Sequence, residues 1–197
     1  MLAGGAGRRI GGGKPSRLLF GRPLIAYPLA ALREAGLDAV VVAKPGVLLP
    51  ALDVPVVLDA SPTLHPLAGI LAALDHAEGP VIVVAADMPF LEPALLRALA
   101  TADPGAAVVA AEAGGTLEPL CARYSPAVRD ALWQALEREA PLRRTLAGLS
   151  PATIPTHAGV VVNVNTPEDL EQAERRQPRS SAVANASIPS SKPIVGS

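Results

Sequence analysis

The chain has 197 residues, of which 50% are hydrophobic, and its formal net charge at pH 7 is −1. A chain of this length can bury one good core and usually forms a single domain. The small net charge and the scattered Lys and Arg residues argue against nucleic-acid binding, no stretch is apolar enough to span a membrane, and the lone Cys121 excludes an internal disulfide. We therefore expect a cytoplasmic protein that binds neither nucleic acid nor a membrane.

Runs of β-branched residues alternate with helical stretches along the chain. Each run has the continuous apolar character of a strand buried on both faces, which is typical of parallel sheets. The predicted strands cover residues 39–43, 54–58, 81–85, 106–110 and 160–164, and the predicted helices cover residues 23–35, 67–75, 93–100 and 127–139. The alternation predicts a three-layer α/β/α domain with a mostly parallel sheet, in which ligands bind beyond the carboxyl ends of the strands.

The chain ends in a capped helix followed by a change of composition. Thr166 can cap a helix in which Pro167 takes the first position, and this helix is predicted to run to about Arg176. Residues 177–197 contain six Ser, three Pro, two basic residues and no acid, a composition that cannot bury enough apolar surface to order itself. We therefore predict a domain over residues 1–176 and a disordered tail over residues 177–197.

A glycine-rich segment opens the chain, from Gly4 to Gly13, and it carries Arg9 and is followed by Lys14. Glycine leaves backbone N–H groups open to phosphate oxygens, and the two basic side chains can supply charge to a triphosphate. A flexible N-terminus is the alternative explanation.

Two familiar phosphate-binding motifs do not fit this segment. A P-loop needs Gly at position 8 and Ser or Thr at position 15, where Arg8 and Pro15 stand. A dinucleotide-binding fingerprint that begins at Gly5 needs Gly at position 10, where Ile10 stands. The segment therefore requires a different template.

Two aspartates come directly after predicted strands. Asp87 is expected at the carboxyl end of a buried strand, where one carboxylate facing a bound triphosphate can hold Mg²⁺. Asp59 has a similar place after the preceding strand and can accept the N1 and N2 protons of guanine. Each has a structural alternative, which is a turn cap before Pro89 for Asp87 and an Asx turn for Asp59.

Asn163 and Asn165 stand two residues apart in the last predicted strand. Side chains at this spacing point to the same face of a strand, so both can reach one site. Hydrogen bonding at the strand end is the alternative explanation.

The opening of the chain resembles the molybdenum cofactor guanylyltransferase family. The shared pattern is L-A-G-G-x-x-x-R-x-G-x-x-K, which is filled by Leu2, Ala3, Gly4, Gly5, Arg9, Gly11 and Lys14. The likeness continues in the family's order to about residue 176, through Arg22-Pro23-Leu24, Asp59, Pro66-Leu67-Ala68-Gly69-Ile70, Ala86-Asp87-Met88-Pro89-Phe90, Glu118-Pro119-Leu120 and Asn163-Val164-Asn165-Thr166-Pro167-Glu168-Asp169-Leu170. It implies a Rossmann-like nucleotidyltransferase domain that moves GMP from GTP onto molybdopterin and releases pyrophosphate.

The resemblance also implies roles for individual residues. It makes Lys14, Arg9 and Asp87 catalytic, with Mg²⁺ held by Asp87, and it places Asn163 and Asn165 on the acceptor side. The implied nucleotide-binding residues are Leu2, Ala3, Gly4, Gly5, Gly11, Lys14, Asp59 and Asp87. Cytidylyl-transferring relatives have Ala where Gly4 stands, so Gly4 indicates a purine base. The implied protein partners are molybdoenzymes or cofactor-insertion proteins.

Two other functions fit the same residues. One is the transfer of CMP or another nucleotide to a different phosphorylated acceptor on the same fold. The other is a nucleotide-binding module without turnover, which would keep the glycine loop and lose the metal-holding residues. Asp87 and Lys14 are both present, which favours an enzyme.

This sequence departs from the family in two places. Relatives carry an apolar run ahead of the glycine loop that forms the first, central strand, whereas this sequence begins at Met1-Leu2. We therefore expect that strand to be nearly absent, either because the true start lies upstream or because the fold is impaired. His65 stands where relatives usually have Gly, and an imidazole there is expected to crowd a loop that comes close to the nucleotide.

Overall fold

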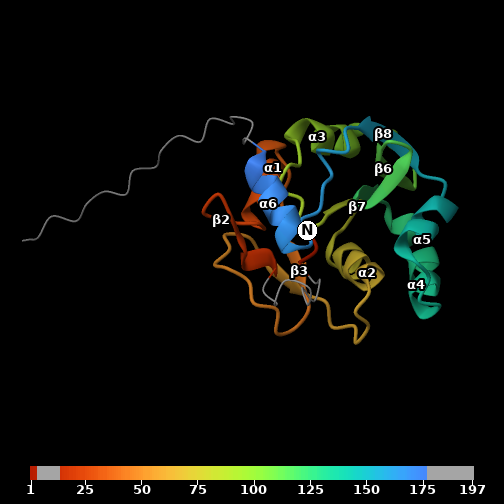
Figure 1. Cartoon of the computed structure of the whole chain (residues 1–197). Helices are drawn as coiled ribbons and strands as arrows, with labels where there is room; N and C mark the ends of the chain where they lie inside the picture. Colours follow the sequence, from red (N-terminus) through yellow and green to blue (C-terminus); the bar gives the residue numbers. More distant parts are fainter. Residues whose placement is uncertain (4–13, 177–197) are drawn as a thin grey trace, which may run out of the picture.

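Strands and helices alternate along the chain in the computed structural model, which describes residues 1–3 and 14–176 (Figure 1). The strands are β1 (Leu18–Leu19), β2 (Arg22–Pro23), β3 (Val41–Ala43), β4 (Val56–Leu58), β5 (Val81–Val84), β6 (Val108–Ala113), β7 (Thr116–Tyr124) and β8 (Ala152–Thr156). The helices are η2 (Lys14–Ser16), α1 (Ala26–Glu34), α2 (Pro66–His76), α3 (Pro93–Thr101), η3 (Pro126–Val128), α4 (Arg129–Glu137), α5 (Leu142–Gly148) and α6 (Pro167–Arg175). The predicted α/β class is confirmed.

Leu2 lies between β3 and β5 and joins them. It forms parallel bridges to Val42 on one side and to Ala85 on the other. Its N–H donates to the Val84 carbonyl at 2.8 Å, and the Ala3 N–H donates to the Val42 carbonyl at 2.8 Å. Figure 1 accordingly shows the N-terminus in the middle of the molecule. The central strand is very short, as expected, yet these few residues link the two halves of the sheet.

The sheet is mixed, so the prediction of a mostly parallel sheet is met only in part. β3 pairs with β4 and β6 pairs with β8 in parallel, whereas β7 lies antiparallel between β5 and β6. The cause is a tight hairpin that the sequence analysis missed. Gly114 and Gly115 have φ of 57° and 75°, and this pair of left-handed residues joins β6 directly to β7. A two-residue hairpin allows only antiparallel pairing.

The predicted strand at residues 160–164 is wrong. This segment begins in a turn closed by the Val160 N–H and the His157 carbonyl at 2.9 Å. Farther along, the Val164 N–H donates to the Asp87 carbonyl at 2.9 Å. The apolar residues 160, 161 and 164 are buried, but they are buried as a loop packed against the domain. A buried loop needs apolar residues just as a buried strand does, which explains why this run has the composition of a strand.

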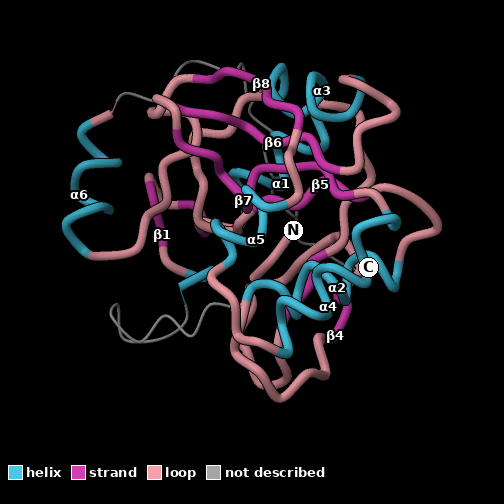
Figure 2. The backbone as a smooth tube through the Cα atoms, turned by 90° about the vertical axis from the view of Figure 1, so that its right-hand side faces the viewer, coloured by secondary structure: helices cyan, strands magenta, loops and turns pink. Residues whose placement is uncertain are grey.

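Helices cover both faces of the sheet, and two hydrophobic cores result. Neighbouring residues of β6 point to opposite faces, so Val109 belongs to the core beneath α1 and α3, whereas Val108 belongs to the core beneath α2 and α4. Figure 2 shows α2 and α4 side by side below the sheet. Apolar burial on both faces explains the unbroken apolar runs of β3 and β5.

The last helix, α6, begins at a complete capping box. The Thr166 side chain accepts from the Asp169 N–H at 3.1 Å, and the Asp169 carboxylate accepts from the Thr166 N–H at 2.9 Å. Pro167 occupies the first turn, so the predicted start of this helix is confirmed. Within the described ranges, no helix is long and apolar enough to cross a membrane.

Candidate nucleotide-binding site

A pocket of about 250 Å³ opens at the carboxyl ends of the central strands. Leu2 and Ala3, the ends of β3 and β5, and the start of α2 form its walls. The lining residues are Leu2, Ala3, Pro15, Val42, Ala43, Lys44, Asp59, Leu64, His65, Pro66, Gly69, Ala85, Ala86, Asp87 and Leu120. In an open α/β sheet this is the edge at which ligands bind. We therefore treat this pocket as the candidate site.

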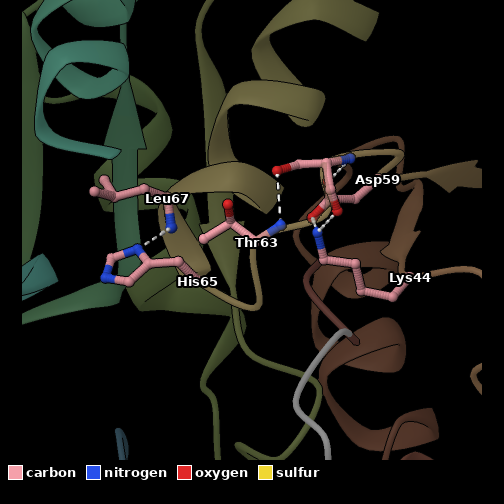
Figure 3. Close-up of polar contacts among 6 residues, drawn as sticks. Lys44, Asp59, Thr63, His65 and Leu67 are labelled. Carbon is pink, nitrogen blue, oxygen red and sulfur yellow. Dashed lines mark hydrogen bonds and ion pairs between the residues drawn. The ribbon is translucent and has the colours of Figure 1, made fainter. Parts of the chain in front are cut away.

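A buried ion pair forms one end of the pocket (Figure 3). The Lys44 Nζ lies 2.9 Å from the Asp59 Oδ2, and the two side chains are only 11% and 7% exposed. The same Nζ donates to the Ser61 carbonyl at 2.5 Å, and the Ser61 N–H donates to the Asp59 Oδ1 at 3.0 Å. The Asx turn considered from the sequence is therefore present, and Asp59 also faces the pocket.

His65 caps α2 at the mouth of the pocket. Its Nδ1 accepts from the Leu67 N–H at 3.2 Å, as Figure 3 shows, so the ring satisfies one of the free N–H groups at the helix start. With Nδ1 as acceptor, the proton of the neutral ring sits on Nε2. The half-buried ring lies on the pocket wall, and its expected crowding of the nucleotide stays a prediction.

The glycine of the Pro-Leu-Ala-Gly segment has a packing role. A Cβ added at Gly69 would lie 3.2 Å from the Leu2 Cδ2 and 3.3 Å from the Leu2 Cδ1, closer than most real Cβ contacts. Gly69 therefore lets α2 approach the short central strand closely. This contact holds the Leu2 backbone at the pocket wall.

Asp87 lies at the other end of the pocket, in the turn that follows β5. Its side chain is half-buried, and its carbonyl accepts the hydrogen bond from Val164. The prediction that Asp87 emerges at the carboxyl end of a buried strand is confirmed. Metal ligation by Asp87 stays a prediction, as does the alternative of a turn cap.

Asn163 and Asn165 flank the residue that is bonded to Asp87, so they approach this end of the pocket without lining it. Asn163 is half-buried and Asn165 is exposed. The Asn165 N–H donates to the Asp169 carboxylate at 2.8 Å, which ties it to the start of α6. Their expected common face on a strand is wrong, because residues 160–164 form a loop.

Glu118 adds a second carboxylate near Asp87. Burial raises its pKa, the neighbouring Arg143 lowers it, and the charge of Asp87 raises it further, with a net upward shift. The Arg143 Nη2 lies 3.2 Å from the Glu118 Oε2. Glu118 pairs with Ala111 and lies directly before an irregularity in β7, because the neighbouring Ala110 pairs with Ala122.

This β-bulge shapes the wall of the pocket. The buried Tyr124 hydroxyl donates to the Pro119 carbonyl at 2.8 Å, and the Ala85 N–H donates to the Leu120 carbonyl at 3.1 Å. These two hydrogen bonds hold the backbone of the bulge at Pro119 and Leu120, and Leu120 lines the pocket. Bulges that direct a side chain toward an active site are common.

The structure describes only some of the predicted site residues. Leu2, Ala3, Asp59 and Asp87 line one pocket, as the sequence analysis expected of nucleotide-binding residues. Gly4, Gly5, Arg9 and Gly11 lie outside the described residues, and only the backbone of Lys14 is described, at the start of η2. The predicted tail at residues 177–197 is also outside them.

Lys44 and the pair of Glu118 and Arg143 were missed as site residues. Lys44 follows a predicted strand directly, as Asp59 and Asp87 do, and this position was an available signal. Glu118 lies in a segment that supports the family resemblance, but the strand that carries it was not predicted. Arg143 is 25 residues from Glu118, so only the fold brings the two together.

The residues at Asp87 fit a magnesium ion that is held mainly by a substrate. Within the described residues no group of three or more His, Cys, Asp or Glu side chains could hold a metal ion alone. Mg²⁺ in nucleotide enzymes usually takes one or two carboxylates and completes its shell with phosphate oxygens and water. Asp87, with Glu118 nearby, provides such a set.

Comparisons with known proteins identify the family. A model of the MobA-like NTP transferase domain matches residues 1–153. The chain is 36% identical to a molybdenum cofactor guanylyltransferase of Rhodobacter capsulatus, over 89% of this chain and 94% of that protein. It is 34% identical to one of Rhizobium meliloti (strain 1021), over 88% of each protein.

A solved structure supports the same assignment. The crystal structure of molybdopterin-guanine dinucleotide biosynthesis protein A from Archaeoglobus fulgidus matches with a TM-score of 0.73 and 28% sequence identity, covering 88% of this chain and 95% of that chain. These matches confirm the resemblance found in the sequence. The chain belongs to the MobA-like NTP transferase family.

Proposed function

We propose that this protein is a molybdenum cofactor guanylyltransferase, which transfers GMP from GTP to molybdopterin and releases pyrophosphate. The observation that carries the proposal is the likeness to guanylyltransferases over nearly nine-tenths of the chain. The pocket supports it, because a charged, hydrogen-bonding end at Asp59 and a carboxylate end at Asp87 suit a base and a metal-bound triphosphate.

The framework proposed for this site is a three-layer, Rossmann-like nucleotidyltransferase domain. The two cores on opposite faces of the sheet support it, as do parallel strands on both sides of Leu2. Parallel strands collect their carboxyl ends at one edge, so Ala3, Lys44, Asp59 and Asp87 meet there.

The reaction is an in-line displacement at the α-phosphorus of GTP. An oxygen of the acceptor's phosphate attacks, the bond to the β-phosphate breaks, and pyrophosphate leaves with the electron pair. The acceptor phosphate is already anionic at neutral pH, so the protein needs neither a nucleophilic side chain nor a general base. Positioning and charge neutralisation supply the rate in such transfers.

The phosphates are assigned to the glycine-rich opening. Its backbone N–H groups, Arg9 and Lys14 surround the triphosphate in this proposal, which rests on the sequence pattern alone for these residues. Asp87 would hold Mg²⁺, which neutralises charge on the phosphates when it is bound. Asn163 and Asn165 are assigned to the acceptor side because their segment is bonded to the Asp87 backbone.

The guanine base is assigned to the other end. Asp59 accepts from the guanine N1–H and N2–H, while Gly4, which has no Cβ, leaves room for the two-ring base. Asp59 is 5% exposed, so a base that leaves it without a donor carries the cost of an unsatisfied buried group.

The deciding experiment measures pyrophosphate release from Mg²⁺ and GTP in the presence and absence of molybdopterin. We expect release that depends on both substrates, and a guanine dinucleotide of molybdopterin as product. Release with CTP in place of GTP would support cytidylyl transfer instead. Nucleotide binding without any release, with molybdopterin present, would identify a binding module.

A further inference from the structure

Lys44 and Asp59 occupy adjacent positions at the ends of two parallel strands. The Asp59 N–H donates to the Ala43 carbonyl at 2.9 Å, which continues the pairing of β3 with β4 and sets the two side chains next to each other. Both side chains are almost fully buried and both line the pocket. Removing two charges from water is costly, and apolar pairs often serve stability as well. Fold stability alone is therefore a weak explanation for this pair.

The pair retains hydrogen-bonding capacity toward the pocket. The Lys44 ammonium has three N–H groups, and its bonds to Asp59 and to the Ser61 carbonyl use two of them. The described part of the chain offers no partner for the third. Each Asp59 oxygen accepts one bond within the protein and has a second lone pair. One donor and two acceptors thus stand in a fixed order.

This order matches one edge of guanine. Guanine presents an acceptor at O6, followed by donors at N1 and at the amino group on C2. Adenine presents a donor at N6 and an acceptor at N1, which is the opposite order, and it has no amino group on C2. An ammonium beside a carboxylate therefore faces complementary groups on guanine and like groups on adenine.

We propose that Lys44 is a specificity-determining residue that donates a hydrogen bond from Nζ to the guanine O6 while Asp59 accepts from N1–H and N2–H. The inference rests on the proposed function, which puts the base at this end of the pocket. It adds a second charged contact to base recognition and gives the buried ion pair a role in reading the nucleotide.

The test uses GTP analogues that change one group at a time. In 6-thio-GTP a sulfur, which is a weak acceptor, replaces O6, whereas ITP keeps O6 and N1–H and lacks only the amino group on C2. Calorimetry would measure the Kd of each, with Mg²⁺, for the wild type and for Lys44→Met. We expect the wild type to bind 6-thio-GTP about tenfold or more weakly than GTP, because hydrogen bonds to charged groups are strong.

The variant should change one ratio and leave the other. Lys44→Met should bind GTP more weakly and should no longer distinguish GTP from 6-thio-GTP, because the donor to O6 is gone. Its ratio of GTP to ITP affinity should match that of the wild type, since the C2 amino group faces Asp59. Equal binding of GTP and 6-thio-GTP by the wild type, or an unchanged ratio in Lys44→Met, would overturn the inference.

A matched control is available outside the pocket. Arg33→Met breaks the exposed ion pair of Arg33 with Asp53 and should leave all three Kd values unchanged. If Lys44→Met does not fold, the wild-type ratio of GTP to 6-thio-GTP still decides the question. Equal wild-type affinities for GTP, ATP and CTP would instead contradict the base specificity of the proposed function.

Discussion

The two ends of the pocket handle charge in different ways. At the Lys44 end, an ammonium and a carboxylate pair with each other inside the protein, and both are almost fully buried. At the Asp87 end, a second carboxylate, Glu118, lies near the first, and the side chain of its ion-pair partner Arg143 is 59% exposed. The first end is neutral as a unit, whereas the second brings two carboxylates near each other.

This difference indicates two kinds of contribution to the reaction. A neutral, fixed array of donors and acceptors suits the edge of a base, which carries no charge. A pair of carboxylates suits a cation that in turn meets phosphate oxygens. Substitutions at the Asp87 end should therefore act on turnover, and substitutions at the Lys44 end should act on the choice of nucleotide.

The largest expected effect is that of Asp87→Asn on turnover. The change removes a metal-binding charge with little change in packing, so we expect kcat to fall by about two orders of magnitude or more. The thermal melt should stay nearly unchanged, because Asp87 is only half-buried. Pyrophosphate release with GTP, Mg²⁺ and molybdopterin measures kcat. Near-normal turnover would remove Asp87 from the metal assignment.

A control for this variant is Asp75→Asn. Asp75 forms an exposed ion pair with Arg129, with a distance of 2.7 Å between its Oδ1 and the Arg129 Nε. It lies outside the pocket lining. Exposed pairs contribute about 0–1 kcal/mol to stability, so this variant should keep both its melt and its turnover.

At the other end, Asp59→Asn should reduce the selectivity among nucleotides. We expect the wild type to prefer GTP to ATP and CTP by at least about tenfold, because ATP leaves a buried carboxylate without donors. Replacing the acceptor by an amide should remove most of this preference. Competition titrations of the three nucleotides measure it, with Asp53→Asn, in the exposed pair with Arg33, as the control. A preference that survives in Asp59→Asn would place the base elsewhere.

The sequence predicted the site best where the signal was local. Asp59 and Asp87 each follow an apolar run, and the rule that ligands bind at the carboxyl ends of strands places both in one pocket. Lys44 obeys the same rule and was missed because its partner is 15 residues away, so only the pairing of β3 with β4 brings the two charges together.

The fold was predicted less completely in the second half of the chain. The strand β7 carries Glu118, Pro119 and Arg123, which interrupt the apolar pattern of a buried strand, and its bulge breaks the alternation. The apolar residues at 160–164 had the composition of a strand but pack as a loop. The sequence of a segment shows how apolar it is. Whether the segment forms a strand also depends on which other segment it pairs with, and the local sequence does not determine that partner.

A smaller effect is expected from Glu118→Gln, which tests whether burial or the ion pair with Arg143 dominates at this second carboxylate. Burial and Asp87 raise the pKa of Glu118 despite Arg143, so the ionised form is disfavoured in the folded protein. The negative charge of Glu118 therefore lowers the free energy of unfolding at pH values above the pKa of Glu118 in the folded protein. This loss disappears as the pH falls below the ordinary pKa that the carboxyl has in the unfolded chain. Glu118→Gln should thus melt at a higher temperature than the wild type at pH 7.

The pH dependence provides the check on this sign. Below about pH 3, where Glu118 is protonated in both the folded and the unfolded chain, the two proteins should melt alike. Melting curves across this range measure the difference. A variant that melts at a lower temperature at pH 7 would show that the ion pair with Arg143 outweighs the burial of Glu118.

The smallest effect should come from removing residues 177–197, the segment whose composition predicts a disordered tail. The cut after Arg176 keeps this residue, whose Nη1 donates to the Gly159 carbonyl at 3.1 Å and whose guanidinium lies 4.9 Å from the Phe90 ring centre. A polar, Ser-rich segment contributes little to a fold, so activity should stay within about twofold and the melt should be unchanged. A chain cut one residue earlier loses both contacts of Arg176 and should melt at a lower temperature, since a cation–π contact at an exposed site contributes about 0.5–1 kcal/mol. If the longer chain loses most of its activity while the melts are as expected, residues 177–197 take part in substrate binding, and the two-ended description of the site would need a third element.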